Sequence, residues 1–253
     1  TESSTESTEQ GTEEAKAAMT EDEINEMLSG MKATETAETE TVTEEQSEVI
    51  PVKFEELQTV NPDVYAWITV PGTDIDYPIL QHASDNSYYL MHNIDGSYGY
   101  PGCIYTENLN SKDFTDNNTV IYGHNMKNGS MFAQLHKYED PDFFDANREV
   151  LIYLPNEVLH YTIFAAHIYD DRHLLYSFDF TDPEVYQKYL DSIFSIRDMS
   201  ANIDKDMTVT TDDQIITLVT CIGSQPNNRL LVQAVLTDRE PGTETVQTAA
   251  TTE

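Results

Sequence analysis

QIITLVTCIGSQPNNRLLVQAVL, residues 214–236, is the stretch of sequence that decides the fold. It contains two apolar runs rich in β-branched residues, one ending at Cys221 and the other beginning at Arg229. A polar segment with Gly, Ser, Pro and Asn separates the runs, and apolar runs bounded in this way are typical of β-strands. The pattern therefore predicts two neighbouring strands that hold a thiol and a guanidinium group across one loop.

This pair of groups indicates acyl-transfer chemistry. The thiolate is the nucleophilic form of cysteine, and a nearby cation lowers the pKa of a thiol. The same cation can stabilise an oxyanion. A base is offered by His124, which follows the apolar strand 120–122 and Gly123, a glycine that we expect to leave room for a substrate backbone. Each of these residues also has an ordinary explanation when taken singly. Cys221 could be a buried residue at a strand end, and His124 and Arg229 could be exposed side chains without a catalytic role.

Several segments in order resemble the class B sortases. TLVTC (217–221) followed by Arg229 resembles the TLxTC…R signature of sortases, and VIYGHNMKNGSMFAQL (120–135) is similar to the histidine segment of class B. The likeness extends upstream through WITVPGTDIDYPILQ (67–81) and covers roughly residues 52–238. The combination, in this order, is far more specific than any one segment.

The resemblance implies a mainly β fold: a closed sortase-type barrel of about eight strands, with N-terminal helices and a helix inserted in the connection before the cysteine strand. The sequence Asp182-Pro183-Glu184 supports that inserted helix, because an N-cap residue, a proline and an acid mark a helix start.

The resemblance also implies an activity, that of a cysteine transpeptidase. Cys221 would attack a threonine carbonyl in the C-terminal sorting motif of a surface protein and form a thioester. A cell-wall precursor amine, or a pilin lysine, would then resolve it. His124 would move the protons and Arg229 would stabilise the oxyanion or fix the substrate backbone. The candidate substrate-binding residues are Tyr176, Thr220 and Asn125.

No cofactor or metal is expected, since nothing matches the calcium-binding arrangement of class A sortases. The expected protein is a monomer on the extracellular face of the membrane or in the cell wall, anchored by a segment upstream of this chain. Two other functions stay open. The chain could be a thiol peptidase that mainly hydrolyses, or a non-catalytic surface scaffold on the same barrel.

Composition limits the partners. With 46 acidic and 13 basic residues the formal net charge is −33, which argues against nucleic acid because phosphate binding needs clustered cations. No apolar run is long enough for a transmembrane helix. The two cysteines, Cys103 and Cys221, are too few for a disulfide framework, and we expect them not to pair because pairing would consume the nucleophile.

The chain divides into three parts by composition. Residues 1–50 are expected to form a disordered acidic linker, 51–238 the catalytic domain and 239–253 a disordered tail. Within the linker, Thr20 to Glu23 has the spacing of a capping box, and we favour a transient helix there over a docked one. Residues 75–80 are expected to form an edge strand, because Pro78 cannot donate to a ladder.

Overall fold

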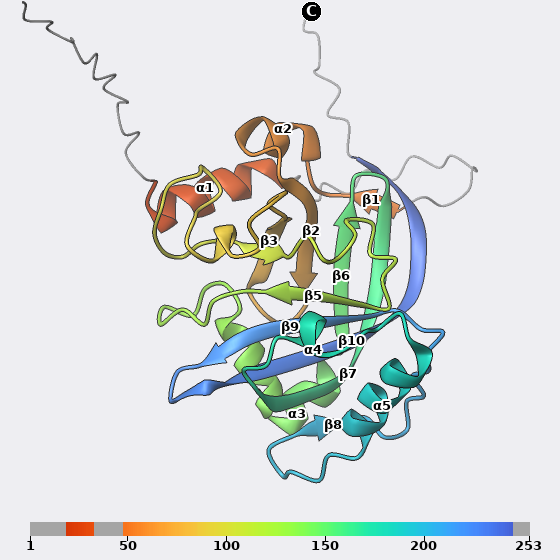
Figure 1. The fold of residues 1–253 in the computed structure, drawn as a ribbon. Coiled ribbons are helices and arrows are strands. Elements are labelled where there is room, and N and C mark those ends of the chain that lie inside the picture. Colours follow the sequence, from red (N-terminus) through yellow and green to blue (C-terminus); the bar gives the residue numbers. More distant parts are fainter. Residues whose placement is uncertain (1–18, 33–47, 245–253) are drawn as a thin grey trace, which may run out of the picture.

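The computed structural model describes residues 19–32 and 48–244 (Figure 1). Eight strands form a closed barrel in the order β2-β3-β4-β5-β9-β10-β7-β6, which the pairing of β6 with β2 completes. This confirms the predicted mainly β barrel. The strands of the ring are β2 (Val64–Val70), β3 (Ile75–Leu80), β4 (Ile104–Thr106), β5 (Asn118–Tyr122), β6 (Glu149–Leu154), β7 (Glu157–Asp170), β9 (Ile215–Ile222) and β10 (Gln225–Glu244).

Two short strands extend the ring at its margins. β1 (Glu48–Ile50) pairs in parallel with the end of β10, and β8 (Asn202–Ile203) pairs with β7. The start of β1 and the end of β10 therefore lie side by side, far from the hairpin that joins β9 to β10 (Figure 1).

Strand β9 lies between two neighbours, which explains its continuous apolar sequence. It pairs in parallel with β5 and antiparallel with β10, and Cys221 is the one exposed residue in it. A strand that is buried on both faces needs apolar side chains at successive positions rather than at alternate ones. The register places Cys221 opposite Arg229, as the sequence predicts.

The turn between β9 and β10 is shorter than the loop that the sequence predicts. The polar segment after Cys221 is predicted to be a loop, whereas β9 continues to Ile222 and β10 starts at Gln225. Ile222 is buried and pairs with Gln225, and the register then shifts before Arg229. Burial of one apolar side chain past the thiol thus converts most of the predicted loop into an irregular hairpin.

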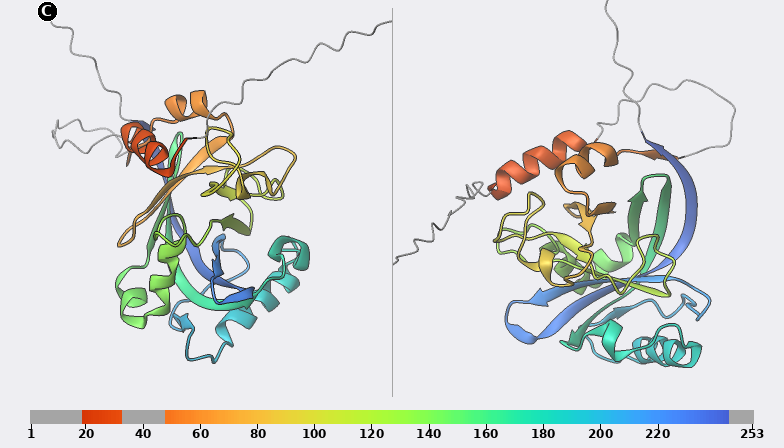
Figure 2. Two further views of the ribbon diagram at one scale, coloured as in Figure 1. Left: turned by 90° about the vertical axis from the view of Figure 1, so that its left-hand side faces the viewer. Right: turned by 45° about the horizontal axis from the view of Figure 1, so that its top comes forward.

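Helices cover opposite ends of the molecule (Figure 2). At one end lie α1 (Glu21–Met31) and α2 (Phe54–Val60); at the other lies α5 (Pro183–Phe194), which Asp182 caps as predicted. Shorter helical segments connect the strands. They are η1 (Tyr88–Leu90), η2 (Ala133–Glu139), α3 (Pro141–Ala146) and α4 (Leu174–Ser177).

Helix α1 is docked, so our preference for a transient helix is wrong. Its capping box is present as predicted, but Ile24 and Leu28 are only 7% exposed and belong to a core cluster with Trp67 and Phe54. Lys32 adds an ion pair of 2.6 Å with Asp76. Two buried apolar side chains together with a partly buried ion pair hold the helix on the barrel.

Strand β3 is not an edge strand, which corrects a second expectation. It pairs antiparallel with β2 on one side and in parallel with β4 on the other. The ladder with β4 consists of Ile79 and Leu80 and begins just after Pro78. The proline therefore lies beyond the paired part of that side, where its missing N–H breaks no hydrogen bond.

Packed elements lie on both sides of the predicted domain boundaries. Helix α1 and strand β1 belong to the stretch predicted as linker, and β10 continues to Glu244 within the stretch predicted as tail. The predicted disorder of 1–18, 33–47 and 245–253 falls outside the described residues. No helix in the described ranges is long and apolar enough to cross a membrane.

Candidate active site

A groove of about 390 Å³ opens beside the end of β9. Its lining includes Cys221, Arg229, His124 and Thr220, so four of the six residues chosen from the sequence meet in one place. They come from β9, β10 and the segment after β5. The rest of the wall is formed by the ends of β4, β5 and β7 and by the start of α4.

Cys221 presents its thiol at the one exposed position of β9. Arg229 is its cross-strand partner on β10 and lines the same groove. The Arg229 Nη1 donates hydrogen bonds of 2.9 Å to the carbonyls of Pro226 and Asn228. Among the described residues these are the hydrogen bonds of the guanidinium, which leaves its Nη2 and Nε groups available to donate to a substrate.

His124 is oriented by a backbone carbonyl. Its Nε2 lies 2.7 Å from the carbonyl oxygen of Leu90, at the end of η1. Because a carbonyl oxygen only accepts, Nε2 carries the proton in this geometry, and Nδ1 is the nitrogen left for a thiol or a substrate. The ring of Tyr100 meets the imidazole edge-on at 5.1 Å. The contact with Leu90 lies in a stretch whose polar composition predicts mostly loop and gave no signal for it.

A partly buried hydrogen bond joins the segments that carry the nucleophile and the base. The Thr220 hydroxyl donates to the Gly123 carbonyl at 2.9 Å, and Thr220 is 1% exposed. Each partner directly precedes one of the two reactive residues. Gly123 also lies against packed side chains, since a Cβ there would be 2.5 Å from the Ile104 Cδ1. The glycine is thus required by packing, and because it also lines the groove, its role in leaving room for a substrate backbone stays a prediction.

Asn125 holds the backbone of the nucleophile. Its Nδ2 donates to the Cys221 carbonyl at 2.9 Å and lies 2.9 Å from the Nε2 of His136. That imidazole nitrogen is itself 3.1 Å from the same carbonyl, and Glu139 lies 3.4 Å from its Nδ1. His136 lies on η2, and no sequence motif indicates its place beside the Cys221 carbonyl.

The groove wall also contains a carboxylate–imidazole pair. Both Glu107 carboxylate oxygens lie 2.8 Å from the Nε2 of His173, and both residues line the groove. Burial and then the charge of Glu107 raise the pKa of the Tyr122 phenol, which stays protonated as a hydrogen-bond donor. Tyr176 packs its ring on His173 at 4.3 Å, but it is 71% exposed and lines a neighbouring hollow, not this groove.

The second cysteine is inert in this arrangement. Cys103 is buried and free, and its Sγ lies 3.4 Å from the His92 carbonyl. Burial raises the pKa of its thiol, so it stays protonated. In the described part of the chain, the side chains best placed to hold a metal ion are outside the groove, on β1, β7 and β10.

Comparison with known proteins gives one consistent family. Residues 68–237 match the family described as "Sortase domain". Sortase B of Listeria monocytogenes is 37% identical over 171 residues, 67% of each chain. The solved sortase B of Clostridium perfringens shares 33% identity with a TM-score of 0.65, covering 74% of this chain and all of that one. A Bacillus anthracis structure described as similar to sortase B shares 30% identity with a TM-score of 0.67, covering 87% and 98%.

Proposed function

This chain belongs to the sortase family as a class B member, and hence a cysteine transpeptidase, and on that premise we propose that Cys221, His124 and Arg229 perform its acyl transfer. The observation that carries this assignment is the groove, which an exposed thiol, an oriented imidazole and a cross-strand guanidinium all line. The three groups come from separate segments, and a role in packing alone would not require them to meet at one opening.

The proposed reaction has two halves. In the first, the Cys221 sulfur attacks the carbonyl carbon of a threonine in the sorting motif, and Arg229 donates hydrogen bonds to the oxyanion. The His124 Nδ1 takes the proton of the Cys221 thiol and gives it to the leaving amine as the peptide C–N bond breaks, and a thioester remains on Cys221. In the second half, an acceptor amine attacks the thioester and loses a proton to His124. An amide forms and the thiol is released.

The proposed substrate is a surface protein that carries a C-terminal sorting motif. The proposed acceptor is an amine of a cell-wall peptide precursor, with a pilin lysine as the alternative. We place the reaction at the extracellular face of the cell membrane. The polar groups of the groove wall, including the Glu107–His173 pair and the protonated Tyr122 phenol, are suited to hydrogen-bonding an extended peptide backbone.

A peptidase that mainly hydrolyses uses the same three residues, so geometry does not favour it over transfer. The two differ in whether water or an amine reaches the thioester first. A scaffold without activity is disfavoured by the exposed thiol, because an unreactive cysteine is ordinarily buried, as Cys103 is here.

The test is mass spectrometry of the protein mixed with a panel of sorting-motif peptides, with and without an amine acceptor. We expect a thioester adduct on Cys221 that the amine converts into a ligated amide, and no adduct with Cys221→Ala. Release of free acid in the presence of excess amine would identify a hydrolase. Ligation by Cys221→Ala would overturn the proposal.

A second variant pair isolates the role of Arg229. Arg229→Ala removes the guanidinium beside the thiol and is expected to lower kcat by about 10²–10³-fold, the effect of losing one oxyanion donor. Arg172→Ala is the matched control, because Arg172 also lines the groove but pairs with Asp170 at 2.7 Å. Equal losses of kcat in the two variants would mean that Arg229 contributes only its positive charge to the groove and no specific hydrogen bond.

A further inference from the structure

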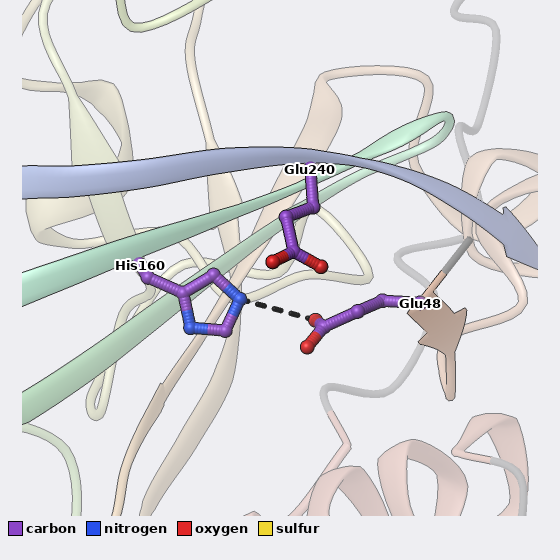
Figure 3. A group of neighbouring side chains, drawn as sticks. All are labelled: Glu48, His160 and Glu240. Carbon is purple, nitrogen blue, oxygen red and sulfur yellow. Dashed lines mark hydrogen bonds and ion pairs between the residues drawn. The ribbon is translucent and has the colours of Figure 1, made fainter. Parts of the chain in front are cut away.

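An imidazole and two carboxylates converge on the outside of the barrel, at the end of β10 away from Arg229 (Figure 3). The register explains why they meet. His160 on β7 is opposite Asp238, and Glu48 on β1 is opposite Gly242. Glu240 is two residues from each of these β10 positions, and residues two apart on a strand share a face. Glu48, His160 and Glu240 are therefore neighbours on one surface.

The three side chains point toward one another (Figure 3). One ligand atom from each of the three residues lies within 4.8 Å of the others, and the His160 Nε2 is 3.1 Å from a Glu48 oxygen. A four-coordinate ion with bonds of about 2.1 Å separates its ligand atoms by roughly 3.4 Å. Small adjustments of the three side chains would therefore bring their ligand atoms to the spacing that one bound ion requires.

A fourth residue acts on the far side of the imidazole. The His160 Nδ1 lies 3.7 Å from a Glu149 oxygen. Leu151 is opposite His160 on β6, and Glu149, two residues before Leu151, lies on the same face. Metal-bound histidines generally direct their second ring nitrogen to a carboxylate, which fixes the tautomer and the ring orientation. This contact is independent of the convergence of the other three side chains.

The charges of the cluster also call for a cation. Since a carboxylate oxygen only accepts, the His160 Nε2 donates its 3.1 Å hydrogen bond to Glu48, and Glu240 adds a second negative group. Within residues 19–32 and 48–244, no lysine or arginine forms an ion pair with Glu48 or Glu240. A positive ion that takes the place of the Nε2 proton, with the remaining ring proton on the Nδ1 beside Glu149, offsets the repulsion between the two carboxylates.

We propose that Glu48, His160 and Glu240 bind a divalent transition-metal ion, with Zn²⁺ preferred, and that Glu149 orients the imidazole. One nitrogen and two carboxylate donors suit Zn²⁺, whereas Ca²⁺ and Mg²⁺ take oxygen ligands. The ion joins β1 to β7 and β10. It therefore fastens the N-terminal strand, which has three residue pairs with β10, to the barrel at a place remote from Cys221.

The test is calorimetric titration of ZnCl₂ into the full chain carrying Cys221→Ala, since the exposed thiol is a competing zinc ligand. We expect one Zn²⁺ per chain and a higher melting temperature with zinc than with CaCl₂. Glu240→Gln and His160→Gln should each weaken binding at least tenfold, and Glu149→Gln by about tenfold. Glu184→Gln is the matched control, because that carboxylate is exposed on α5, and it should bind zinc like the parent.

Co²⁺ provides a second measurement that does not depend on stability. The parent should show visible ligand-field absorption with Co²⁺ that His160→Gln loses while its circular dichroism spectrum is unchanged. The proposal is overturned if millimolar zinc does not bind. It is equally overturned if binding of one ion survives both Glu240→Gln and His160→Gln unweakened.

Discussion

Replacing Thr220 by valine tests whether this residue ties the two reactive segments together or binds substrate. Its hydroxyl donates a 2.9 Å hydrogen bond to the Gly123 carbonyl, and the residue is 1% exposed. Valine has nearly the same shape and lacks the donor. Thr220→Val therefore removes the tie between the residue before Cys221 and the residue before His124 without opening a large cavity.

The magnitude follows from leaving a partly buried carbonyl without its donor. Such a loss costs about 1–3 kcal/mol of folding free energy. For a domain of this size each kcal/mol lowers the melting temperature by about 2–4 °C. If about 1 kcal/mol of the loss appears as misalignment of the thiol and the imidazole, kcat decreases roughly fivefold. KM should not change, because in this account the hydroxyl does not touch the substrate.

The assay is steady-state transpeptidation with a peptide that carries the preferred sorting motif, combined with thermal unfolding. Thr220→Ser is the matched control, since it keeps the hydroxyl and should retain kcat and most of the stability. A Thr220→Val protein with an unchanged melting temperature, an unchanged kcat and a raised KM would refute the reasoning. It would support substrate binding by Thr220, the role expected from the sequence.

Three further perturbations test other parts of the structure. Gly123→Ala places a Cβ 2.5 Å from the Ile104 Cδ1 and should lower the free energy of unfolding, measured in urea titrations, by about 1–3 kcal/mol. Gly223→Ala is the control, because a Cβ there has no atom within 4 Å and should leave the free energy of unfolding unchanged. Asn125→Ala removes a donor to the Cys221 carbonyl and should lower kcat by up to about tenfold at constant KM; a change in KM alone would indicate substrate contact instead. Burial lowers the pKa of His167 below its usual 6.5, so that on acidification the unfolded chain takes up the proton before the folded chain does. The free energy of unfolding should therefore decrease as the pH is lowered from about 6.5, by at most about 1.4 kcal/mol per pH unit. Urea unfolding between pH 5 and 8 should show a smaller loss in His167→Gln, and equal pH slopes would contradict this account.

The strands and their chemistry were largely predictable from local pattern. Apolar runs on either side of a short polar segment indicate the hairpin that carries Cys221 and Arg229, and the helix start at Asp182 follows from capping chemistry. The same local rules failed where neighbours decide the outcome. Pro78 suggested an edge strand, yet β3 is paired on both sides because its second ladder begins after the proline.

Contacts across the sequence were not predictable, because no local pattern encodes them. The Leu90 carbonyl that orients His124 is 34 residues away from it, and Asn125 is 96 residues from the Cys221 carbonyl it holds. For the same reason the sequence predicts no metal site, whereas the register of β1, β7 and β10 places Glu48, His160 and Glu240 together.

The sequence by itself thus determined which segments become strands and which side chains stand at their ends, since backbone propensity and side-chain alternation act over a few residues. The tertiary structure alone decided which of those ends meet, how the imidazole and the nucleophile's backbone are held, and that α1 docks on the barrel. These depend on strand register and on packing between distant segments, where a shift of one residue would turn each side chain to the other face.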